Sequence, residues 1–77
     1  MSVLEPTRPV PRVGGFARIA HFGGDFEPAR ILAVGEQGRL LEVQGESGER
    51  YEFELHPATA QFLPRGQRHG PRLELFG

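Results

Sequence analysis

The residues best suited to binding a ligand occupy one short stretch, PRGQRHGPR, which ends at Arg72. Besides Arg72 it holds Arg65, Arg68 and His69, and the glycines and prolines between them predict a loop. Arginine forms paired hydrogen bonds with phosphate or carboxylate groups, so such a loop could position a nucleic-acid backbone. The competing interpretation is a loop that is simply solvated.

A second candidate is the pair of aromatic residues, Phe22 and Phe26, that brackets a Gly-Gly-Asp turn. Exposed aromatic side chains act as anchors in protein interfaces and as platforms on which bases stack. Alternatively, at least one ring covers an end of the core, as large apolar side chains commonly do. The two glycines are no phosphate-binding loop, because the pattern G-x-x-x-x-G-K is absent.

No pattern in the sequence predicts catalysis. Cysteine and lysine are absent, and neither Ser2 nor Ser47 has a context typical of an activated nucleophile. The three histidines, His21, His56 and His69, lie far apart and lack the short spacing typical of metal ligands. We therefore expect a protein that is not an enzyme and that carries no metal and no cofactor.

The clearest structural element is the run RYEFEL, which begins at Arg50. Successive side chains of a strand point to opposite faces, so Tyr51, Phe53 and Leu55 are predicted to face a core. The charged residues between them are predicted to face water. The two glutamates of this run are therefore interpreted as solubilising and edge-protecting residues rather than as an acid–base pair.

Other segments with the composition of strands flank this run. These segments are residues 16–22, 29–34, 39–43 and 72–76. The segment 29–34 is almost continuously apolar, which indicates a central strand, although a short buried helix has the same pattern. In the last segment, Leu73 and Leu75 are predicted to face inward. Glycine-containing turns separate most of these segments, at a spacing typical of a small barrel or sandwich.

Two regions leave their structure open. The segment 16–22 has apolar residues on both faces, so its buried face is not determined by the pattern. One face would carry Phe16, Arg18, Ala20 and Phe22, and the other Ala17, Ile19 and His21. Between residues 56 and 63, a single helical turn that starts near Pro57 and a short strand that starts near Thr59 are both compatible with the sequence.

These elements predict an all-β protein, a small barrel of five or six strands with an SH3-like or Tudor-like meander. The likeness is one of size and strand order alone, because no family motif is present. The barrel is expected to span residues 14–77. An extended or disordered arm, residues 1–13, is expected to precede it, since three prolines there favour extended backbone.

Charge and hydropathy set the expected surroundings and partners. The net charge is −1, and the two ends of the chain are basic while its middle is acidic. On folding, these opposite charges either meet and neutralise each other, or the two ends together form a basic patch. No apolar run is long enough to span a membrane, and no signal peptide is evident, so we expect a cytoplasmic protein.

The function expected from the sequence is that of a binding module. A protein partner or a second copy of the chain ranks first, because the chain has no net positive charge. The alternative is single-stranded nucleic acid, RNA before DNA, bound by the arginine-rich loop and by exposed aromatic rings. An active site shared between subunits is a third possibility, but no set of residues in the sequence indicates one.

Overall fold

The chain forms six β-strands, and all the turns between them except the β4–β5 turn contain glycine. The candidate binding residues lie on these strands or in the loops that join them. The structure, a computed structural model, describes residues 11–76. The strands are β1 (Phe16–Ala20), β2 (Phe26–Gly35), β3 (Leu40–Gly45), β4 (Arg50–His56), β5 (Gln61–Pro64) and β6 (Arg72–Leu75). A short 3-10 turn, η1 (Glu36–Gly38), connects β2 to β3. The state expected for residues 1–10 of the arm lies outside the described residues.

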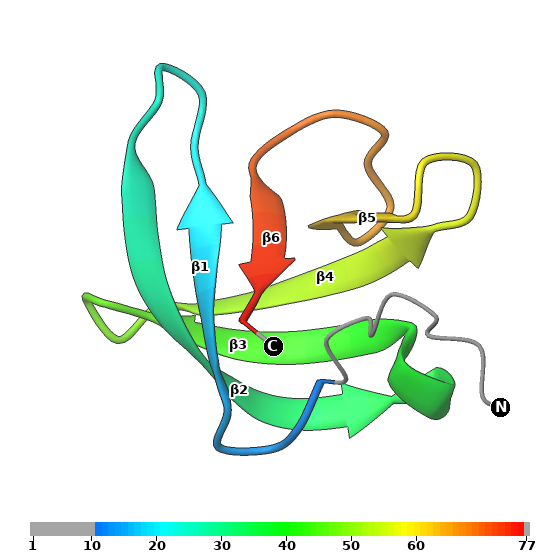
Figure 1. Ribbon diagram of the computed structural model, residues 1–77, viewed down its shortest axis with the longest axis horizontal. Helices are drawn as coiled ribbons and strands as arrows, with labels where there is room; N and C mark the ends of the chain where they lie inside the picture. Colours follow the sequence, from blue (N-terminus) through cyan, green and yellow to red (C-terminus); the bar gives the residue numbers. More distant parts are fainter. Residues whose placement is uncertain (1–10, 77) are drawn as a thin grey trace, which may run out of the picture.

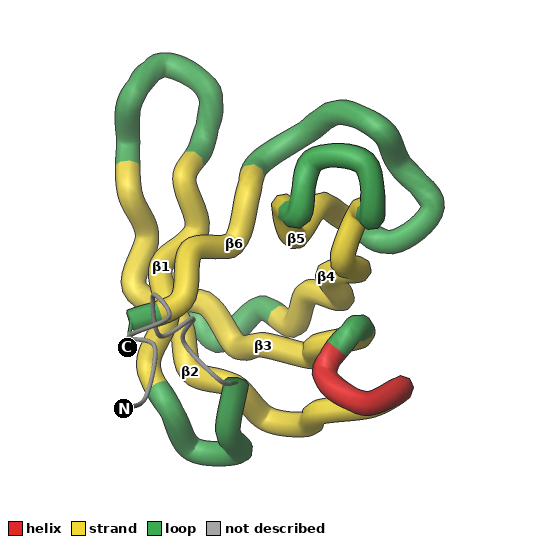
Figure 2. The backbone as a smooth tube through the Cα atoms, turned by 45° about the vertical axis from the view of Figure 1, so that its right-hand side comes forward, coloured by secondary structure: helices red, strands yellow, loops and turns green. Residues whose placement is uncertain are grey.

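The six strands form a closed antiparallel barrel (Figure 1). Each strand pairs with the next along the chain, and β6 pairs with β1 to close the ring. Figure 2 shows the strands wrapped around a common interior. The predicted all-β small barrel is therefore confirmed, with six strands in meander order. Closure matters in so short a chain because it pairs the first and last strands, whose backbone groups would otherwise be exposed edges.

The interior is filled by residues that alternate along the strands. The four largest fully buried side chains are those of Phe53, Ile19, Leu41 and Val43. The alternation predicted for β4 is confirmed for Phe53, which is buried, for Tyr51, which packs against the core, and for the exposed charged residues between the apolar ones. Leu55 is half-buried and lines an open groove at the edge of the core. Burial of this kind is the main favourable term in folding, at about 25 cal/mol per Å² of apolar surface.

Strand β1 has its small and aliphatic residues inside and its aromatic residue outside. Ala17 and Ile19 are buried, whereas Phe16 is 62% exposed. The structure thereby decides which face of β1 is buried, a point that the sequence left open.

Strand β2 begins at Phe26, earlier than the segment 29–34 suggested, and its register with β3 shifts between Ile31 and Ala33. Phe22, predicted to end the first strand, lies in the turn before β2.

The region after β4 contains both of the elements that the sequence allowed. The amides of Thr59 and Ala60 donate to the carbonyl of His56 over 3.3 and 2.8 Å, which closes a single turn, and β5 follows. Strand β5 pairs with β6 only where Phe62 faces Leu73. An open groove of about 700 Å³ lies beside this short junction.

Candidate binding surface

Four of the six residues predicted to bind a ligand come together in the structure. Phe22, Arg68, His69 and Arg72 line one hollow of about 200 Å³, together with His56 at the end of β4. In Figure 1 the β5–β6 loop, drawn in orange, lies between the β1–β2 turn and the β4–β5 turn. These three connections supply the hollow with side chains from distant parts of the sequence. We refer to it as the loop hollow.

The other two predicted residues lie elsewhere. Arg65 is tied to β4, because its backbone amide donates to the carbonyl of Glu52 over 3.0 Å and its Nη1 to the carboxylate of Glu52 over 3.2 Å. Phe26 is the first residue of β2, and its ring lies on the outside of the barrel. The loop hollow therefore contains four of the six candidate residues, and Arg65 and Phe26 lie outside it.

A second surface covers the outside of three neighbouring strands, β6, β1 and β2. The strand register places its side chains in adjacent rows on the outer side of the sheet. Its members are Phe16, Arg18, Phe26, Arg30, Arg72, Glu74 and Phe76. We call it the aromatic–arginine face, and Arg72 belongs both to it and to the loop hollow.

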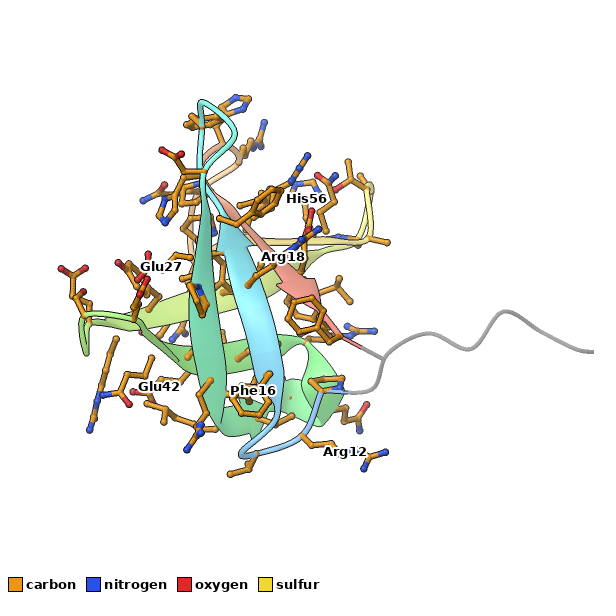
Figure 3. The ribbon with its side chains drawn as sticks, turned by 60° about the vertical axis from the view of Figure 1, so that its left-hand side comes forward. Arg12, Phe16, Arg18, Glu27, Glu42 and His56 are labelled. Atoms are coloured by element: carbon orange, nitrogen blue, oxygen red, sulfur yellow. The ribbon has the colours of Figure 1, made fainter. Side chains whose placement is uncertain are left out.

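Stacking between guanidinium groups and phenyl rings organises this face. The Arg18 guanidinium lies 4.1 Å from the centre of the Phe26 ring and 5.8 Å from that of Phe76. Its Nε donates to the Glu74 carboxylate over 2.6 Å. Arg18 is thus held by two rings and one carboxylate. The guanidinium of Arg30 lies 5.1 Å from the centre of the Phe16 ring. Figure 3 labels Arg18 and Phe16, which both lie on β1. Such cation–π contacts contribute about 0.5–1 kcal/mol each at exposed sites.

The phenyl rings of the face remain largely open to solvent. Phe16, Phe26 and Phe76 expose 62%, 54% and 56% of their surface. Isolated exposed apolar residues are ordinary, but three large rings gathered on one sheet face are typical of a surface that is covered by a partner. The rings lie outside the core and are accessible from outside the barrel.

Charge is separated across the barrel. The aromatic–arginine face has three arginines against one glutamate, a surplus of two positive charges. Strands β3 and β4 and the turn between them carry five glutamates against one arginine, a surplus of four negative charges. These residues are Glu42, Glu46, Glu49, Glu52, Glu54 and Arg50. We call this surface the acidic wall. Because β4 lies three strands from β1 in the ring, the two surfaces face away from each other.

Sequence reasoning missed part of the aromatic–arginine face, namely Phe16, Arg30 and Phe76. The first strand gave no decisive signal, because Phe16 and Arg18 alternate with Ala17 and Ile19 and both of its sides carry apolar residues. Pairing of β1 with both β2 and β6 then brings the other rings beside it.

A separate cluster of titratable groups ties the β1–β2 turn to the β3–β4 turn. His21 Nε2 lies 2.8 Å from one carboxylate oxygen of Glu27, and the other oxygen accepts a hydrogen bond of 3.0 Å from the amide of Glu46. Nearby, the Tyr51 hydroxyl donates to Glu49 over 2.6 Å. This hydrogen bond, partial burial and the neighbouring carboxylates raise the pKa of Tyr51 to about 12. These contacts join two turns, and they form a structural tie.

Within residues 11–76, no three or more histidine, cysteine, aspartate or glutamate side chains are grouped so that they could hold a metal ion. In the same part of the chain, no helix has the length and apolar character needed to cross a membrane. Comparisons with protein-family models, with curated proteins and with solved structures found no match to this chain. The surfaces described above are therefore the basis for any functional proposal.

Proposed function

We propose that the protein is a non-enzymatic module that binds single-stranded nucleic acid on its aromatic–arginine face. The observation that carries this proposal is the set of three exposed phenyl rings interleaved with arginines on one sheet. Single strands are bound by aromatic rings on which bases stack and by cationic groups that follow the backbone. A sheet face with exposed aromatic residues is one of the recurrent ways in which proteins present such a platform to RNA.

The geometry of Arg18 supports this use of the face. Its guanidinium lies against the Phe26 ring, has the Phe76 ring nearby and is anchored by Glu74, so the group is ordered before a ligand binds and little conformational entropy remains to be lost. Bases would stack on the exposed rings that Arg18 holds in place. Arg30 and Arg72, which are both exposed, are available for phosphate contacts on either side of this central residue.

The distribution of charge removes the argument that ranked a protein partner first. That ranking depended on the net charge of −1. Electrostatic attraction at short range is governed by local charge, since the Debye length is about 8 Å at physiological ionic strength. A face with surplus positive charge, turned away from the acidic wall, can attract a phosphate backbone although the whole chain is slightly negative.

Titration of labelled single-stranded oligonucleotides, followed by fluorescence anisotropy at about 50 and 200 mM salt, tests the proposal. If Arg30 and Arg72 contact phosphates, the slope of log affinity against log salt is about −1.4, and affinity falls roughly sevenfold over this range. Phe26→Ala should weaken binding about fivefold or more, because loss of one stacked base costs about 1–3 kcal/mol. Arg30→Gln should reduce the steepness of the slope by about 0.7.

Arg50→Gln is the matched control, since Arg50 is exposed and belongs to the acidic wall. It should leave the affinity and the salt slope unchanged. Absence of binding at the lower salt concentration contradicts the proposal. Equal losses for Phe26→Ala and Arg50→Gln contradict the assignment of the surface.

A protein partner, or a second copy of the chain, is a second candidate. The charge of the acidic wall is complementary to that of the aromatic–arginine face, and arginine and aromatic residues dominate the centres of protein interfaces. Sedimentation velocity at increasing protein concentration tests self-association through these two surfaces. Association that salt weakens and that Arg30→Glu abolishes supports this candidate. A monomer at all concentrations and salt conditions rules out self-association.

A further inference from the structure

The loop hollow has a lining that suits an anion. Its charged and titratable members are two arginines and two histidines: Arg68, Arg72, His56 and His69. The hydroxyl of Thr59 and the amide of Gln61 add neutral hydrogen-bonding groups. No described residue that lines the hollow carries a carboxylate. In a chain with more acidic than basic residues, a hollow with this selection of side chains is not the expected outcome of composition.

The two arginines differ in how far their charge is already used. The Nη2 of Arg72 lies 3.7 Å from the Glu74 carboxylate on the aromatic–arginine face, so its charge is partly compensated. Within the described residues, Arg68 has no ion-pair partner, and it is exposed on the β5–β6 loop. Arg68 is therefore the main source of uncompensated positive charge at the hollow.

His56, one of the residues that line the hollow, also has a buried nitrogen that is not itself exposed to the hollow. Nδ1 of His56, a residue labelled in Figure 3, is buried and has no hydrogen-bond partner within residues 11–76. A buried polar atom without a partner costs about 1–3 kcal/mol, and such atoms are rare in folded proteins. Their occurrence is more common at functional sites, where stability is sacrificed for another role.

The size of the hollow is also suitable. Its volume of about 200 Å³ corresponds to about seven water molecules at ~30 Å³ each. This space accepts one tetrahedral oxyanion with some of its water. A guanidinium group binds such an anion through two parallel hydrogen bonds, which lysine cannot reproduce.

The arrangement of cationic and hydrogen-bonding groups points to a phosphate-binding site in the loop hollow. The phosphate group would be held by Arg68 and Arg72, with His69, Thr59 and Gln61 completing its hydrogen bonds. Phe22 is 77% exposed at the rim, where it would contact the organic part of a phosphate ester. This inference does not depend on nucleic-acid binding by the aromatic–arginine face.

Two neighbouring arginines of the same loop provide the test. Arg68 lines the hollow, whereas Arg65 lies outside it and is paired with Glu52 on β4. Binding of inorganic phosphate is measured by chemical-shift changes of the backbone amides, with sodium chloride at matched ionic strength as the reference. We expect saturable shifts at the amides around residues 56–59 and 68–72. Arg68→Gln should weaken phosphate binding at least about tenfold, and Arg65→Gln should leave it unchanged.

Each outcome decides the inference. Shifts that saturate with phosphate, and that Arg68→Gln but not Arg65→Gln removes, support a phosphate site. Equal effects of the two substitutions indicate attraction by general charge and overturn the site. Absence of saturable shifts at tens of millimolar phosphate also overturns it. Both residues are exposed, so neither substitution is expected to unfold the barrel.

A second arm identifies the source of the phosphate group. Oligonucleotides with and without a 5′-phosphate are compared on the wild-type protein and on Arg68→Gln. Tighter binding of the phosphorylated strand, lost in Arg68→Gln, assigns the hollow to a strand end. Equal binding of the two strands, together with saturable binding of inorganic phosphate, assigns it to a small phosphate compound. If no oligonucleotide binds while phosphate does, the proposed function fails and the phosphate site stands.

Discussion

Phe53→Ala is the sharpest test of the packing described here. The ring is 1% exposed and lies at the centre of the core cluster, so its removal leaves a cavity that the surrounding strands can fill only in part. Substitutions of this kind cost about 3–5 kcal/mol. A chain of 77 residues has a total free energy of unfolding of about 4–12 kcal/mol, so the substitution would remove a large part of it.

Urea unfolding followed by far-ultraviolet circular dichroism measures this loss. With a slope near 1 kcal/mol per M, the low end for small domains, the midpoint should fall by about 3 M or the barrel should be unfolded without urea. Phe53→Leu keeps an apolar side chain in the core and should cost less than about 1.5 kcal/mol, which keeps the measurement possible if the alanine variant does not fold.

Phe16→Ala is the matched control, because it removes the same side chain from the outer side of the barrel. Its ring is 62% exposed and contacts mainly the Arg30 guanidinium, so the loss should stay below about 1 kcal/mol. Equal midpoint shifts for Phe16→Ala and Phe53→Ala would refute the facing of the two strands. A midpoint for Phe53→Ala within error of the wild type would refute the core itself.

Three further outcomes follow from local contacts. The phenolate absorbance of Tyr51, the only tyrosine, should titrate near pH 12, and Glu49→Gln should lower that midpoint. The tyrosine of the unfolded chain titrates near pH 10. The stabilisation linked to this pKa difference is therefore complete below pH 10 and is lost as pH rises toward 12. Gly45→Ala should destabilise by about 1–3 kcal/mol in urea unfolding, because the added Cβ would overlap the Glu27 carboxylate and displace its hydrogen bonds. Arg65→Ala should shift the free energy of unfolding by less than about 0.5 kcal/mol, since its ion pair with β4 is exposed at both ends. Larger loss in this last variant would show that the pair holds the loop.

The strands that the sequence predicted well are those with pure alternation. In β4, charged residues separate Tyr51, Phe53 and Leu55, so only one facing buries the apolar side chains without burying charge. The same holds for β6, where Leu73 is buried and Leu75 packs against the core. Glycine marks every turn between consecutive strands except the one between β4 and β5, which is why a small barrel of five or six strands could be anticipated.

The facing of β1 could not be predicted, because both of its sides are apolar. Only the partners decide: Ala17 pairs with Ala29 of β2 and Leu75 of β6, and Ile19 pairs with Leu73 of β6. The pairings with β6 link positions far apart in the sequence. The candidate site was affected in the same way. Arg68 and His69 could be selected as candidate binding residues from the composition of their loop. Phe22 and Phe26 could not be assigned to different surfaces, because the sequence did not show which side of the β1–β2 hairpin faces outward.

The bond between Arg18 and Glu74 spans 56 positions of the chain, because the barrel is sealed by its first and last strands. Hairpins between consecutive strands need only short loops, whereas this seam requires the whole intervening polypeptide to be arranged first. Ring closure should therefore be a late event in folding, with slow kinetics for so small a chain. The aromatic–arginine face straddles the seam, so it is complete only when the ring has closed; before that, the β1–β2 hairpin can present only the part that lacks Arg72, Glu74 and Phe76.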